Sequence, residues 1–231
     1  MPHQKDVALD PAEIERATRL LFPPGAVTEV RIPKTRAGVI AGYFDNSADL
    51  VAAIREVDPR YRPAGIYCVL NPVVPALLGR AYNRLRERSE HTTADSNIVQ
   101  RRWLPVDLDP VRPAGISSSD EEHEAALARA RTIADEMAGE WGRPILADSG
   151  NGAHLLYGID LPNDEDGRQI VTGALAMLDQ RYSDSIVKVD VTCANAARIW
   201  KVYGTVARKG DSIPGRPHRV SRLLEVPDGT S

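Results

Sequence analysis

Apolar and polar residues alternate along the first hundred positions with two different spacings, which predicts helices interleaved with strands. Apolar residues in 11–21 recur at helical spacing, and Asp10 and Pro11 suit the N-cap and first position of a helix. The segments 26–33 and 37–44 have the composition of strands and are joined by a short polar link. We therefore expect a helix followed by a pair of strands.

The rest of this first part continues the pattern. Asn46 or Ser47 is suited to open a helix over 47–57. A short apolar run within 65–72 ends at a proline and predicts a buried strand. We expect 75–88 to form a helix with a basic face, followed by an exposed polar loop.

The second half begins with a strand over 101–110 that ends in acidic residues. Ser118 and Glu121 have the spacing of a capping box, and the helix that they open carries one apolar stripe. Two strands follow on either side of the tight turn at 149–153. Another helix comes next, and 185–192 is expected to be a strand.

The order of these elements predicts a fold class. Asn163 and Asp166 are placed to open the second helix, and 198–206 is a further expected strand. Strand–helix–strand–strand–helix–strand from about Arg101 to Val206 is the split βαβ, or ferredoxin-like, arrangement. It predicts an α+β fold whose mostly antiparallel sheet has its helices on one face.

Composition narrows the class of protein. The 231 residues are 42% hydrophobic and 26% charged, which is typical of a globular protein, and no apolar run reaches the roughly 18 residues of a membrane span. The first ten residues lack the apolar stretch of a secretory signal. Cys68 and Cys193 form neither a CxxC pair nor a disulfide framework. We therefore expect a cytoplasmic protein with no structural zinc and no membrane partner.

Charge is unevenly distributed along the chain. The formal net charge is −3, yet the region from Val191 to Ser231 has seven Lys and Arg against three acids, so it carries +4 and the remainder −7. A local basic patch on an acidic body suits a site that holds phosphates at one place. The alternative is a solvated C-terminal face.

Three acidic residues are candidate metal ligands. Asp107 and Asp109 lie at i and i+2 on one expected strand, so both side chains leave the same face. Asp190 follows another apolar strand, and the three carboxylates converge if the two strands are neighbours. Carboxylate oxygens suit Mg²⁺ or Mn²⁺, and three acids are able to hold two such ions. The alternatives are solvated acids at a strand end and, for Asp190, a residue that caps a turn.

The glycine-rich turn and the region after Asp190 supply candidate phosphate ligands. Ser149, Asn151 and Gly152 lie in the turn, and His154 leaves it on a strand, so backbone N–H groups and a ring nitrogen are available to phosphate oxygens. An ordinary hairpin turn is the alternative. Downstream cations are expected to complete a triphosphate site, with a salt-bridged edge strand as the alternative. These cations are Arg198, Lys201, Arg208 and Lys209.

Taken in order, these motifs resemble the archaeo-eukaryotic primase superfamily, and most of all the primase–polymerase domains of plasmids, phages and other mobile elements. The first motif is matched by Asp107 and Asp109, the second by Gly152–His154 with Ser149 upstream, and the third by Val189 and Asp190. Arg198, Lys201 and Lys209 match the basic residues that follow the third motif. The resemblance covers about Gly65 to Gly210.

The resemblance implies template-directed nucleotidyl transfer by a primase, a polymerase or both. It implies that Asp107, Asp109 and Asp190 hold two Mg²⁺ or Mn²⁺ ions and that the phosphate ligands bind a nucleoside triphosphate. Single-stranded DNA and a primer are the implied partners in the replication of a mobile element, and a helicase, fused or in trans, is a further candidate. The implied fold is one domain, 1–231, with an N-terminal α/β part, 1–100, beside an RRM-like catalytic part, 101–231.

Two other functions stay open. One is a replication module that binds single-stranded nucleic acid without catalysis, in which the basic patch is kept and the acids are idle. The other is a template-independent nucleotidyl enzyme or cyclase on the same kind of sheet, because ferredoxin-like sheets host many activities.

Overall fold

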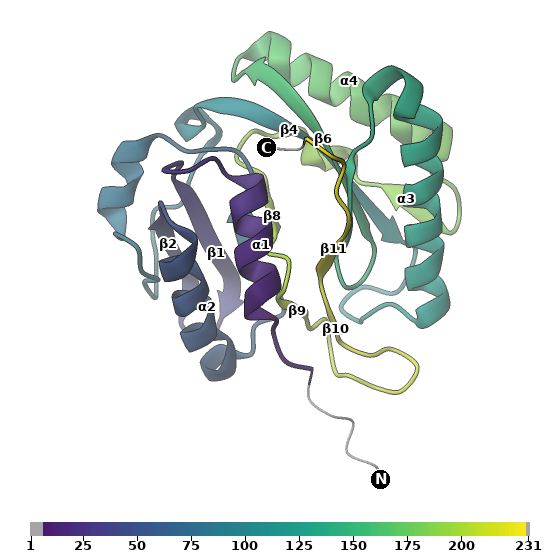
Figure 1. Cartoon of the computed structure of the whole chain (residues 1–231). Coiled ribbons are helices and arrows are strands. Elements are labelled where there is room, and N and C mark those ends of the chain that lie inside the picture. The colour runs from purple at the N-terminus through teal and green to yellow at the C-terminus, as the bar shows by residue number, and fades with distance from the viewer. Residues whose placement is uncertain (1–6, 230–231) are drawn as a thin grey trace.

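The computed structural model describes residues 7–229, which form two larger sheets and a small one of β10 and β9. The larger sheets lie with their helices on either side of the molecule (Figure 1). The prediction that the first ten residues are not a secretory signal falls partly on residues 1–6, which lie outside the described residues. The first sheet has the strand order β2–β1–β3–β8, and all its strand pairs are antiparallel. Its strands are β1 Thr28–Thr35, β2 Gly38–Phe44, β3 Tyr67–Val69 and β8 Ile199–Lys201.

The second sheet has the strand order β11–β5–β6–β4–β7 and is also antiparallel throughout. Its strands are β4 Gln100–Pro110, β5 Ile145–Asp148, β6 Ala153–Pro162, β7 Val187–Val189 and β11 Arg222–Glu225. Without β11, this order is the ferredoxin-like one, so the α+β fold class expected from the sequence is confirmed.

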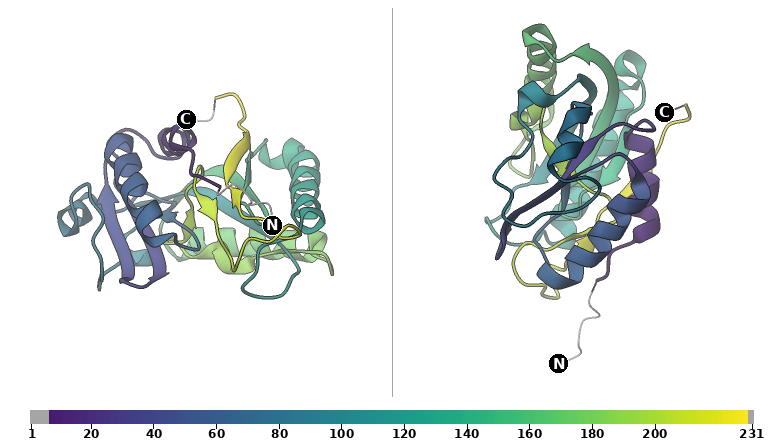
Figure 2. Two further views of the ribbon diagram at one scale, coloured as in Figure 1. Left: turned by 90° about the horizontal axis from the view of Figure 1, so that it is seen from below. Right: turned by 90° about the vertical axis from the view of Figure 1, so that its left-hand side faces the viewer.

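Within the described residues, four α-helices cover the two larger sheets. They are α1 Pro11–Leu21, α2 Ser47–Tyr61, α3 Asp120–Trp141 and α4 Glu165–Tyr182. Helices α1 and α2 pack on the first sheet, whereas α3 and α4 pack on the second (Figure 1). Figure 2 shows the two sheets with their helices side by side, with the yellow-green segments after residue 195 between them. The smaller elements are η1 Pro75–Arg80, η2 Asp95–Asn97, η3 Val191–Ala194, β9 Val206–Ala207 and β10 Arg219–Val220.

Local sequence explains where the helices begin. The Asp10 carboxylate accepts the Glu13 N–H at 3.1 Å, as expected from the pattern. The capping box of α3 is formed by Ser119 and Glu122, one residue later than predicted, because Ser118 is turned towards the 149–153 loop instead. Helix α4 is capped by Asp164, between the two residues expected to open it.

One predicted helix is wrong. Only Pro75–Arg80 forms a helical turn, of the 3₁₀ type, and the chain then runs beside the exposed edge of β2. There the Tyr43 N–H donates to Ala81 O, and the Arg86 N–H donates to Ala41 O at 2.9 Å. The unpaired backbone groups of an edge strand offer hydrogen bonds that outweigh the helical tendency of this segment.

The C-terminal strands also differ from their predicted extents and partners. The strand at 185–192 shrinks to β7, because the chain turns into η3 directly after Asp190. The strand at 198–206 is broken at Gly204, which has a φ of 91°. Its first part, β8, pairs with β3, so a segment from the C-terminal half completes the N-terminal sheet.

The described helices contain no stretch that is both long and apolar enough to cross a bilayer.

Candidate active site

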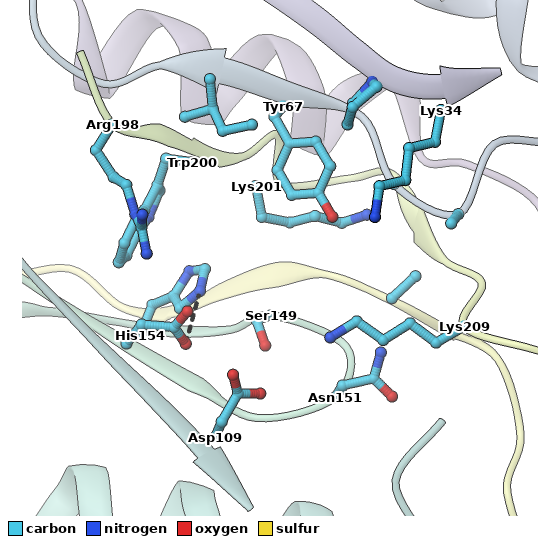
Figure 3. Close-up of a pocket in the computed structure, with 16 residues that line it drawn as sticks. Lys34, Tyr67, Asp109, Ser149, Asn151, His154, Arg198, Trp200, Lys201 and Lys209 are labelled. Atoms are coloured by element: carbon cyan, nitrogen blue, oxygen red, sulfur yellow. Dashed lines mark ion pairs between the residues drawn. The ribbon is translucent and has the colours of Figure 1, made fainter. Parts of the chain in front are cut away.

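A cavity of about 450 Å³ opens where the two sheets face each other. Tyr67 from β3, Lys201 from β8 and His154 from β6 contribute to it (Figure 3). Asp107 contributes from β4. Most of the residues predicted for the site line this one cavity. They are Asp107, Asp109, Ser149, Asn151, His154, Arg198, Lys201 and Lys209. Of the other three, Asp190 and Gly152 lie beside it in contact with Arg198 and Ser149, and Arg208 lies elsewhere.

The carboxylates meet because β7 is the neighbour of β4. Leu108 is paired with Val189, and the Asp190 N–H donates to the Asp107 backbone carbonyl at 2.9 Å. Asp109 projects from the same face of β4 as Asp107. One carboxylate oxygen each from Asp107 and Asp190, and the Cys193 sulfur, all lie within 4.8 Å of one another. Cys193 was missed by the sequence reasoning, although its place three residues after Asp190 on a turn is the signal that it faces the same point.

The two carboxylates on β4 have opposite pKa shifts. Desolvation disfavours the charged form of Asp107, but His154 and the more distant cations outweigh it and lower its pKa. For Asp109, desolvation and the neighbouring charge of Asp107 raise the pKa, against Lys209 and Arg112. Arg112 lies 3.4 Å from the Asp109 carboxylate. Two like charges at this spacing repel, and a cation between them relieves the repulsion.

A protein cation already stands against the third carboxylate. The Arg198 guanidinium pairs with Asp190 at 2.7 Å and donates to the Thr192 hydroxyl at 2.9 Å and towards the Cys193 sulfur at 3.2 Å. Desolvation and Asp107 raise the pKa of the Cys193 thiol, so it stays neutral here. The charged metal-ligating atoms of the cluster are therefore carboxylate oxygens. Such ligands fit Mg²⁺ or Mn²⁺ better than a soft metal.

The turn before β6 is anchored on both sides. The Asp148 carboxylate accepts the Gly150 N–H at 2.6 Å and contacts His123 Nε2 at 2.8 Å. The Asn151 side-chain oxygen accepts the Ser118 N–H at 2.9 Å, which ties the turn to the start of α3. The Ser149 hydroxyl accepts the Gly152 N–H at 3.0 Å. These contacts give the predicted phosphate-binding turn a fixed shape at the cavity wall.

Gly152 packs directly against β4 between the two aspartates of that strand. A Cβ atom at this position would lie 2.2 Å from the Leu108 carbonyl oxygen, a backbone atom that cannot move independently. We expect Gly152→Ala to lower the free energy of unfolding by about 1–3 kcal/mol and to weaken metal binding by displacing β4. Urea denaturation and a metal titration measure the two effects. Gly158→Ala is the control, because its added Cβ meets no atom within 4 Å, and an equal loss in both variants would contradict the prediction.

His154 lies opposite Asp107 in the pairing of β4 with β6. Its Nε2 is 3.5 Å from the Asp107 carboxylate, and its Nδ1 is 2.9 Å from the Tyr203 hydroxyl. Its ring packs on Trp200 with 4.0 Å between ring centroids. His154 is thus buried on one side and faces the cavity on the other.

Cationic side chains occupy the end of the cavity away from β7. Figure 3 shows Lys34, Lys201 and Lys209 pointing towards this end, with Tyr67 beside them. Lys34 and Tyr67 were missed by the sequence reasoning. Lys34 is an ordinary residue of a predicted turn, and its φ of 57°, a left-handed conformation, is a feature that composition does not reveal.

One cation predicted for this set belongs elsewhere. Arg208 is buried and forms a two-pronged pair with Asp58 of α2, at 2.6 and 2.9 Å. Its role in the structure is to connect the C-terminal segment to α2. Lys209, the next residue, is the one that reaches the cavity.

Comparisons with known proteins found no matching family model and no matching curated protein. Among solved structures, the chain is similar to the crystal structure of primase RepB′, with a TM-score of 0.47 and 12% identity over 93% of this chain and 56% of that one. It is also similar to the AEP domain of the cyanophage S-2L primase-polymerase, with a TM-score of 0.49 and 12% identity over 95% of this chain and 91% of that one. The chain therefore spans little more than half the length of the RepB′ chain.

Proposed function

We propose that this chain is a template-directed nucleotidyltransferase that joins nucleoside triphosphates on single-stranded DNA, as a primase, a polymerase or both. One observation carries the proposal. A single cavity has carboxylates at one end, Asp107 and Asp109 with Asp190 beside them, and lysines at the other. This is the charge pattern that a metal-bound triphosphate complements.

We assign the carboxylates Asp107, Asp109 and Asp190 to hold two Mg²⁺ or Mn²⁺ ions. Bound there, the ions supply activation of a 3′-hydroxyl and stabilise charge on the leaving pyrophosphate. The short Arg198–Asp190 pair supports a second role for the protein cation. Arg198 neutralises Asp190 in the free protein, and its donors would become available to a phosphate oxygen if Asp190 held a metal ion.

The remaining residues are assigned to the triphosphate. Ser149 and Asn151 present a hydroxyl and an amide to the cavity, and His154 presents one ring nitrogen. Gly152 is assigned to hold the Ser149 hydroxyl in place through its N–H. Lys201 and Lys209 neutralise the phosphate charge at the far end. The resemblance in motifs also implies a role in the replication of a mobile element, and this stays a prediction.

The test is a gel assay on a single-stranded DNA template, with labelled nucleotides and Mg²⁺ or Mn²⁺, with and without an annealed primer. We expect template-dependent products, and the unprimed lane reports whether the protein starts chains as well as extends them. Products that form equally well without template would favour the template-independent enzyme. No product from folded protein that binds metal would favour the binding module without catalysis.

Lys201 makes nucleotide binding depend on pH. Its amine is buried and donates to Val206 O at 2.9 Å, and desolvation together with the Arg208 charge lowers its pKa to about 7. The free protein at pH 8 therefore holds Lys201 mostly neutral, and a bound triphosphate favours the charged form. We expect uptake of up to about one proton per nucleotide bound, and weaker binding as the pH rises from 7 to 9.

Calorimetric titration of nucleotide in buffers of different ionisation enthalpy measures this uptake. Lys201→Gln is expected to abolish the proton uptake. Lys209→Gln is expected to weaken nucleotide binding but to leave the proton uptake unchanged. A binding enthalpy that is the same in every buffer would contradict the assignment of Lys201.

A further inference from the structure

A chain of hydrogen bonds runs from Trp200 through Tyr203 to His154. The Trp200 Nε1–H donates to the Tyr203 hydroxyl oxygen at 2.8 Å, and the same oxygen lies 2.9 Å from His154 Nδ1. All three residues are buried. Trp200 belongs to β8 of the first sheet and His154 to β6 of the second, so these hydrogen bonds connect the two sheets behind the cavity.

Counting protons along this chain fixes their positions. Indole nitrogen is only a donor, so the Tyr203 oxygen accepts from Trp200. The hydroxyl proton then needs an acceptor, and among residues 7–229 His154 Nδ1 is the one recorded within hydrogen-bond distance. A proton on Nδ1 would leave the buried hydroxyl proton without an acceptor, which costs free energy. Desolvation raises the pKa of Tyr203 well above its usual value, so this hydroxyl keeps its proton.

The orientation of the His154 ring is fixed as well. Its ring packs on Trp200 with 4.0 Å between centroids and 36° between the planes, and it meets Tyr203 nearly edge-on at 5.8 Å. With Nδ1 used as an acceptor, the proton of the neutral ring is on Nε2, which faces the cavity. Nε2 is 3.5 Å from the Asp107 carboxylate, longer than an ordinary hydrogen bond of about 2.7–3.2 Å. Nε2–H therefore has only a long contact with Asp107 and is available to an incoming group.

We propose that Tyr203, itself oriented by Trp200, is a positioning residue that holds His154 as the Nε2–H tautomer, so that a neutral ring always presents a donor to the cavity. The other tautomer would present a lone pair, which repels a phosphate oxygen. The identity of the accepting group as a triphosphate oxygen rests on the proposed function, whereas the tautomer and its cause do not.

The first experiment needs no enzymatic activity. Long-range ¹H–¹⁵N spectra of the ¹⁵N-histidine-labelled protein, at a pH where the ring is neutral, report which nitrogen of His154 carries the proton. His154→Gln assigns the signals. We expect protonated Nε2, unprotonated Nδ1, and a slowly exchanging Tyr203 hydroxyl proton that correlates with Nδ1. A proton on Nδ1, or no such correlation, would overturn the proposal even if the Tyr203 variants do not fold.

The second experiment compares Tyr203→Phe with Tyr157→Phe. Tyr157 is the matched control, because its buried hydroxyl has no recorded hydrogen-bond partner. We expect Tyr203→Phe to mix the two tautomers and to raise the Kd of the metal–nucleotide complex about tenfold, which corresponds to about 1.4 kcal/mol. Tyr157→Phe should leave both unchanged. Equal effects of the two variants, or an effect of Tyr203→Phe that persists undiminished in a His154→Gln background, would overturn the proposal.

The outcomes also separate this inference from the proposed function. A protein that makes no nucleic-acid product but shows the expected tautomer and Tyr203 correlation contradicts the function and retains the positioning role. A protein that polymerises nucleotides while His154 carries its proton on Nδ1 does the reverse.

Discussion

Replacing Asp107 with asparagine should reduce template-directed synthesis by on the order of a thousandfold, or about 4 kcal/mol of transition-state stabilisation. Asp107 belongs both to the acidic cluster and to the contact with His154. It lies within 4.8 Å of the Asp190 oxygen and Cys193 sulfur, and it faces His154 across the strand pair. Its lowered pKa means that it is ionised throughout the neutral range. Asparagine keeps the shape and the acceptor oxygen but removes the charge.

The loss should be one of metal binding and catalysis and not of folding. The Arg198–Asp190 pair and the backbone bonds between β4 and β7 do not involve the Asp107 side chain. We therefore expect the thermal midpoint of Asp107→Asn to stay near or above that of the unmodified protein. Removal of a like charge also lowers the raised pKa of Asp109, so the remaining carboxylate ionises more easily.

Primer extension at saturating Mg²⁺ and at saturating Mn²⁺ measures this effect. Asp166→Asn is the control, because Asp166 is an exposed residue in the first turn of α4 and does not line the cavity. Its activity should equal that of the unmodified protein. An Asp107→Asn protein within threefold of full activity would show that the carboxylate cluster does not hold the catalytic ions.

The sequence predicted the second sheet well because its signals are periodic and local. Alternation along 101–110 placed Asp107 and Asp109 on one face, and the order of strands and helices predicted that the Asp190 strand would lie in the same sheet. Once β7 pairs with β4, the meeting of Asp107 and Asp190 follows from strand geometry. These features depend on the regular geometry of strands and helices, which the spacing of apolar and polar residues in the sequence indicates.

The features that sequence reasoning missed depend on contacts between distant residues. The segment 75–88, which was expected to be a helix, pairs instead with the edge of β2, and no local sequence pattern indicates this pairing. Tyr203 comes 49 residues after His154 in the sequence. It reaches His154 only because the strand that precedes it, β8, joins the first sheet. Lys34 lies near the end of β1, has a left-handed backbone conformation and lines the cavity. Each is a tertiary arrangement imposed on a segment with an ordinary local sequence.

The buried pair between Asp58 and Arg208 should be the most sensitive point for stability. Both side chains are less than one-tenth exposed, and the guanidinium donates to the two carboxylate oxygens at 2.6 and 2.9 Å. Loss of one partner leaves the other charge buried without compensation. We therefore expect Asp58→Ala to lower the free energy of unfolding by about 3–5 kcal/mol, measured by urea denaturation.

The double variant Asp58→Leu/Arg208→Met distinguishes the cost of an unpaired charge from the loss of the contact itself. Because it removes both charges and fills the space with apolar atoms, it should regain most of the lost stability. Glu124→Ala, which breaks the exposed pair with Arg131, should have little effect. If the double variant were as unstable as Asp58→Ala, the pair would be stabilising in its own right. The segment that delivers Lys209 to the cavity would then depend on this bond and not on packing alone.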